Sequence, residues 1–136
     1  MKTTLDSIDI LYAILFASAL KDEITGKIYK LNRQLGSNKE DVVINSLPIT
    51  GNQLQRSTLN VNIYVPDMSI KIDGQTQRQP NYVRLKTLAA LAVLALADHY
   101  NDTYNLWISN QAVLSEDATK QHYVNFRIEF KNVNTL

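Results

Sequence analysis

The sequence predicts an α+β fold: a two-layer sandwich in which a mostly antiparallel sheet of about five strands carries two helices on one face. Helical patterns occupy residues 7–20 and 81–100, and segments typical of strands lie between and after them. Their connections are of hairpin length, which favours antiparallel pairing. Two apolar helices can then cover one face of the sheet. A chain of 136 residues fits a single domain with one core, and no linker or internal repeat divides it.

The first helix is expected over residues 7–20. Ser7 is a suitable N-cap, and Asp6 and Asp9 suit the positive end of a helix. Leu11 and Leu15 then lie on one apolar stripe, which should face the sheet.

The strands follow from alternating apolar and polar residues. In "STLNVNIYVPD", Val61 and Ile63 alternate with Asn60, Asn62 and Tyr64, so one face of this strand needs a core and the other carries amides and a phenol. The expected strands are residues 27–33, 41–49, 54–65, 104–110 (extended by 112–115 beyond a bulge) and 122–133, with turn residues at 34–41.

The second helix, residues 81–100, is apolar on every face from 88 to 97, which predicts a central place in the core. A carboxylate at Leu91 should therefore prevent folding. The predicted core residues are Leu11, Val61, Ile63, Leu88, Leu91, Leu94, Phe126 and Ile128.

Residues 66–80 should project from the single domain, 1–136, either as a small hairpin or as a flexible loop. Asp73-Gly74 is a hairpin-type dipeptide, with Ile70 and Ile72 before it and a glutamine-rich limb after it. A loop of this length in a compact domain is usually functional or disordered.

Composition argues against several classes of protein. The formal net charge of +1 lacks the basic excess expected of a dedicated nucleic-acid binder. No cysteine is present, so a disulfide framework or a cysteine zinc site is impossible. The apolar runs 11–20 and 88–97 are about half the ~20 residues that a membrane span needs, so no membrane contact is expected.

Catalytic motifs are also missing from the sequence. It contains no G-x-S-x-G, no H-E-x-x-H and no P-loop, and its histidines are His99 and His122. We expect no enzyme, no cofactor and no metal site. An enzyme would need a site assembled from scattered residues such as Asp67, Arg84 and His99.

Side-chain amides are unusually frequent, with 13 Asn and 8 Gln spread along the chain. On exposed strands, amides can bind a partner without the desolvation cost of a charge. The alternative is an ordinary surface of low charge without a partner.

The order of "KIYKLNR", "KEDVVINSLPI" and "LNVNIYVPD", a long polar loop, and a helix opening "NYVRLKTL" resembles small proteins of tailed-phage and prophage head-tail joining modules, particularly those of Bacteroidetes phages. These belong to the tail-completion or tail-terminator group, and the resemblance covers residues 8–131. It implies a structural α+β subunit of a ring, expected to be a hexamer, at the neck of the virion.

The same resemblance implies the partners and the location. The ring would cap the tail tube or join it to the connector proteins, after assembly in the cytoplasm of the bacterial host. DNA would pass through its lumen with transient, non-specific contact. The competing reading is a monomeric or dimeric α+β module that binds an unknown protein.

A ring presents two different surfaces of each subunit to two neighbours. The strand's amide face and the projecting segment suit such a contact. The candidate interface residues are Asn60, Asn62, Tyr64, Asp67, Ile70, Ile72, Asp73, Gly74, Gln75 and Gln77. Lys71 and Arg78 are the cations of the projecting segment and the candidates for facing DNA in the lumen.

Overall fold

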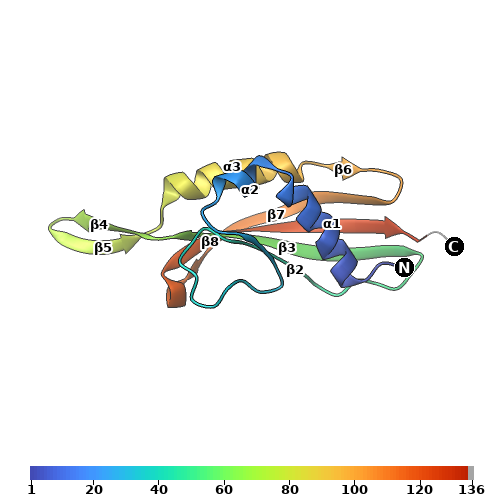
Figure 1. Cartoon of the computed structure of the whole chain (residues 1–136), viewed down its shortest axis with the longest axis horizontal. Coiled ribbons are helices and arrows are strands. Elements are labelled where there is room, and N and C mark those ends of the chain that lie inside the picture. Colours follow the sequence, from blue (N-terminus) through green and yellow to red (C-terminus); the bar gives the residue numbers. More distant parts are fainter. Residues whose placement is uncertain (135–136) are drawn as a thin grey trace.

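The computed structural model describes residues 1–134, which form a curled six-stranded sheet, a separate two-stranded hairpin and three α-helices (Figure 1). The α+β class is confirmed; the main sheet has one strand more than the five expected, the hairpin adds two strands, and there is one helix more. In chain order the elements are α1 (Thr4–Phe16), α2 (Ala19–Glu23), β1 (Ile28–Lys30), β2 (Val42–Ser46), β3 (Leu54–Pro66), β4 (Met68–Ile72), β5 (Gln75–Gln79), α3 (Tyr82–Leu96), β6 (His99–Tyr100), β7 (Tyr104–Glu116), a 3-10 turn η1 (Asp117–Thr119) and β8 (Gln121–Val133).

The sheet has the strand order β1-β2-β3-β8-β7-β6 and is antiparallel except at one pair. β1 runs parallel to β2, so the turn expected at 34–41 does not make a hairpin. The starts of the two strands lie side by side, because Gly26 N–H donates to the Glu40 carbonyl at 2.9 Å and Val42 N–H donates to the Lys27 carbonyl at 3.0 Å. The intervening loop therefore leads back to the end where β1 began.

α1 begins earlier than predicted because Thr3, not Ser7, is its N-cap. The Thr3 side chain accepts from Asp6 N–H at 3.1 Å, and the Asp6 carboxylate accepts from Thr3 N–H at 2.7 Å. This reciprocal capping box satisfies two backbone donors that a helix start leaves open. Ser7 lies one turn inside the helix, buried, and its hydroxyl donates to the Thr4 carbonyl.

The core lies between the helices and one face of the sheet. Of the predicted core residues, Leu11, Val61, Ile63, Leu88, Phe126 and Ile128 are fully buried. Leu91 is only half-buried, and Leu94 is 77% exposed, so the prediction for Leu94 was wrong. A single layer of helices has only one side against the sheet, and in α3 that side carries Leu85, Leu88, Ala92 and Leu96.

Residues 66–80 form the hairpin rather than the flexible loop. β4 and β5 pair along their whole length, and the turn residues Asp73 and Gly74 have φ of 49° and 80°. Positive φ at both central positions marks a type I′ turn, which matches the twist of paired strands. We call residues 68–79 the arm; it extends from the body of the molecule beyond the start of α3 (Figure 1).

Candidate functional site

The base of the arm is fastened by a buried carboxylate. The Asp67 side chain is only 1% exposed and lies 2.6 Å from Nδ1 of His122 and 3.0 Å from Nε of Arg78. Arg78 also reaches the Asp117 carboxylate at 2.8 Å. Asp67 thus joins the outgoing strand, the returning strand and β8, which fixes the direction in which the arm leaves the body.

The rest of the arm is exposed, and the β4 side of one of its faces is apolar. Met68, Ile70 and Ile72 lie on one face of β4, with Gln79, Gln77 and Gln75 opposite them on β5. Lys71 points to the other face by strand alternation. The predicted interface residues 70–77 therefore share one projecting element, whereas Arg78 is engaged with two carboxylates at its base.

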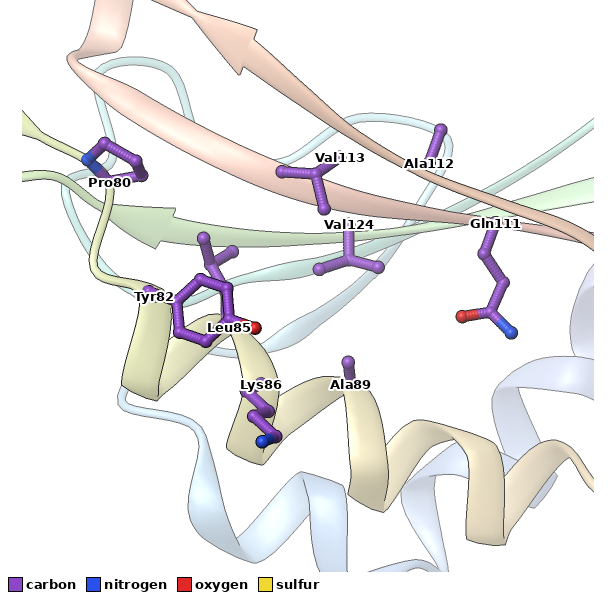
Figure 2. A pocket seen from close by; sticks show the side chains of 9 residues that line it. All are labelled: Pro80, Tyr82, Leu85, Lys86, Ala89, Gln111, Ala112, Val113 and Val124. Carbon is purple, nitrogen blue, oxygen red and sulfur yellow. The ribbon is translucent and has the colours of Figure 1, made fainter.

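A second apolar surface lies where α3 diverges from β7. Here a hollow of about 530 Å³ opens between the helix and the sheet, and we call it the α3–β7 groove. Figure 2 shows Leu85 and Ala89 of the helix opposite Val113 and Val124 of the sheet. The full lining is Pro80, Tyr82, Leu85, Lys86, Ala89, Gln111, Ala112, Val113 and Val124. Val113 is 59% exposed although it lies on the helix-covered face, because α3 does not reach it.

The outer edge of β7 beside this groove is open. β6 pairs only with Asn105 and Leu106, so within residues 1–134 the segment 107–116 has β8 on one side and no strand on the other. A bulge between Ile108 and Asn110 interrupts the register. An open edge presents unpaired N–H and C=O groups to any strand that approaches.

The amide face of β3 forms a ladder across three strands, on the sheet face away from the helices. Asn60 donates to Asn45 at 2.9 Å, and Asn125 donates to Asn60 at 3.2 Å and to Asn62 at 2.6 Å. These side chains are half-buried. Asn60 and Asn62, predicted as partner contacts, are thus hydrogen-bonded to asparagines of the neighbouring strands. Fewer of their amide groups are therefore free to bind another molecule.

Tyr64 lies at a covered end of that same face. The Arg33 guanidinium sits 3.9 Å from its ring centroid, and the Tyr123 ring lies 4.9 Å away. Arg33 is held by Asp41 at 3.4 Å and by the Gln121 side chain. Burial, followed by the nearby Glu116 carboxylate, raises the pKa of Tyr64 above its ordinary value. The sequence pattern of β3 gives no sign of this cover, which comes from a loop distant in sequence.

The scattered residues that an enzyme would need each have different partners. Asp67 contacts His122 and Arg78, and His99 Nε2 lies 2.9 Å from the Ala95 carbonyl. Arg84 binds Glu40 and Glu23, which hold its pKa above the usual value. Among residues 1–134 no group of three or more His, Asp or Glu side chains could hold a metal ion.

In the described part of the chain, no helix has the length and apolar character needed to cross a membrane. No known protein family and no curated protein matches the sequence. The geometry of the arm, the α3–β7 groove and the open strand edge therefore carries the functional argument.

Proposed function

We propose that this chain is a structural subunit that works by assembling into a ring at the neck of a tailed phage. The observation that carries the proposal is the arm, a fastened hairpin that projects from the body with two exposed isoleucines. An isolated two-stranded hairpin is marginally stable in water, so its apolar strip gains stability when another surface covers it.

Further exposed apolar surface supports assembly. Leu94 and Val83 of α3 are 77% and 74% exposed, and Tyr82 is 71% exposed at the mouth of the groove. Val83 and Leu94 are eleven residues apart, near the two ends of α3, and with Tyr82 they present apolar side chains that a neighbouring subunit would cover. The arm and this surface lie on different parts of the subunit, as a head-to-tail contact requires.

The neck location rests on the resemblance to head-tail joining proteins. In that setting the ring, expected to be a hexamer, contacts the tail tube or the connector, and DNA passes through its lumen. The net charge of +1 suits a passage through which DNA slides, because cations that neutralise phosphates create affinity. Lys71, exposed on the arm, is the remaining candidate for DNA contact, since Arg78 is paired with carboxylates.

Light scattering of the purified chain over a series of micromolar concentrations tests assembly. The proposal predicts a concentration-dependent rise to one fixed mass, with closed rings in electron micrographs. A constant monomer or dimer mass over the whole series would instead favour the protein-binding module. Electron microscopy of phage particles labelled at this subunit then tests the neck location.

A further inference from the structure

We propose that the arm of one subunit docks in the α3–β7 groove of the next copy of the same chain, with Ile70 and Ile72 as its anchors. This inference rests on the proposed assembly and names the two surfaces that make the contact. Within residues 1–134, the tip of the arm lies away from the groove of its own subunit (Figure 1).

The arm cannot fill the groove of its own subunit in this arrangement. A five-residue strand is about 17 Å long at the usual rise per residue. Ile72 is the last residue of β4 and so lies at the tip of the arm. At the base, the contacts of Arg78 with Asp67 and Asp117 fix the arm in a direction that leads away from the body. Figure 1 shows the tip of the arm far from α3 and β7. The covering surface must therefore come from another molecule.

The groove has the chemistry and the size to receive the tip. Leu85, Ala89, Val113 and Val124 give it apolar walls on both sides (Figure 2). Its volume of about 530 Å³ falls within the range of roughly 300–1,000 Å³ of sites that bury a small ligand. That volume accommodates the side chains of a hairpin tip, and their transfer from water is favourable at about 25 cal/mol per Å² of apolar surface.

Backbone groups add a second basis for the contact. Segment 107–116 of β7 and the outer edges of β4 and β5 are unpaired with other strands in residues 1–134. An extended segment that adds to a sheet edge gains main-chain hydrogen bonds, while alternate side chains enter adjacent pockets. The arm can supply both, since one face carries isoleucines and its edges are free.

Charge and connectivity favour a second copy as the occupant. Asp73 lies at the tip of the arm beside Ile72, and Lys86 lines the groove, so opposite charges meet when the tip enters. Pro80 directly follows the arm and lines the groove. Each subunit therefore receives one arm beside the base from which its own arm departs. This is a heterologous contact, which repeats from copy to copy and forms a ring if its rotation closes.

Cysteine cross-linking tests the docking directly, because the native chain has no cysteine. Ile72→Cys and Val113→Cys are made in separate chains of different mass, mixed under assembly conditions and oxidised mildly. Docking predicts a mixed disulfide dimer as the main product. Leu114→Cys is the matched control: Leu114 is the next residue of β7, exposed, and directed to the opposite face.

In parallel with the cross-linking, the mass of each mixture before oxidation is measured by light scattering. An oligomer that gives no Ile72–Val113 disulfide, or gives as much with Leu114→Cys, overturns the docking and leaves the proposed function standing. A monomer at every concentration overturns both. Ile70→Cys with Ala89→Cys provides a second pair if either first variant melts at a lower temperature than the native chain.

Discussion

Two leucines on α3 provide a direct test of how the helix is buried. Leu88 is fully buried, and Leu94, on the same helix, is 77% exposed. Replacing a buried leucine by alanine removes its transfer free energy and leaves a cavity, which costs about 2–5 kcal/mol. Replacing an exposed leucine usually changes stability by less than about 0.5 kcal/mol. We therefore expect Leu88→Ala to destabilise the subunit by about 3 kcal/mol and Leu94→Ala to leave it nearly unchanged.

Urea denaturation followed by the fluorescence of the single tryptophan, Trp107, measures both effects. With a slope of about 1.5–2 kcal/mol per molar urea, a loss of 3 kcal/mol lowers the midpoint by about 1.5–2 M. The measurement is made at the lowest protein concentration that gives a fluorescence signal, so that assembly does not contribute to the apparent stability. Equal midpoint shifts for Leu88→Ala and Leu94→Ala would refute the one-sided burial of α3 and with it the exposed apolar surface.

Four further predictions concern the arm, the Arg78 contacts at its base, the cap of the first helix and the covered tyrosine Tyr64. Replacing residues 70–77 by a short Gly-Ser turn should leave the melting temperature of the monomer unchanged. In contrast, Arg78→Ala should lower the free energy of unfolding, measured by denaturation, by roughly 1–3 kcal/mol, because the buried Asp67 carboxylate loses a charged partner. Thr3→Ala should cost about 0.5–2 kcal/mol by the same assay through loss of the cap, and Thr3→Ser is its control. The raised pKa of Tyr64 means that the folded state favours the neutral phenol. The resulting stabilisation of the folded state is fully present below the pKa of an unfolded tyrosine, and it is lost as the pH rises through the pKa of Tyr64 in the folded state. Alkaline absorbance titration should show one late tyrosine that Tyr64→Phe removes; a titration unaltered by that substitution would contradict its burial.

Two of the three longest strands, β3 and β8, and the arm could be predicted from the sequence. Residues 54–65 and 122–133 were placed within one residue of β3 and β8, because one face of each is buried and alternation is therefore strict. Asp73-Gly74 similarly predicted the hairpin turn, since it suits two consecutive positive φ values.

The parallel pairing of β1 and the cover over Tyr64 could not be predicted. Both depend on the loop at 31–41, whose residue Arg33 bonds to Gln121, 88 positions away in the chain. The local sequence pattern does not predict a contact between residues so far apart in the chain. The loop's turn residues are equally compatible with a hairpin. Its observed course is held by tertiary bonds, among them the bond of Arg33 to Gln121 and the bond from Lys27 N–H to the Asp41 carboxylate at 3.1 Å.

The exposure of Leu94 was missed for a different reason. Hydrophobicity on every face of a helix predicts burial on every side, but it does not say whether the same chain or a partner provides the cover. In this fold one layer of helices leaves the outer side of α3 open.

Sedimentation velocity of the native chain and of the double variant Ile70→Asp/Ile72→Asp, at equal micromolar concentration, shows whether the subunits assemble through the arm. Both substitutions lie on exposed positions of the arm, so the two proteins should have the same melting temperature as monomers. We expect the native chain to sediment as one closed oligomer and the variant to sediment as a monomer. A variant that forms the same oligomer as the native chain would contradict assembly through the arm.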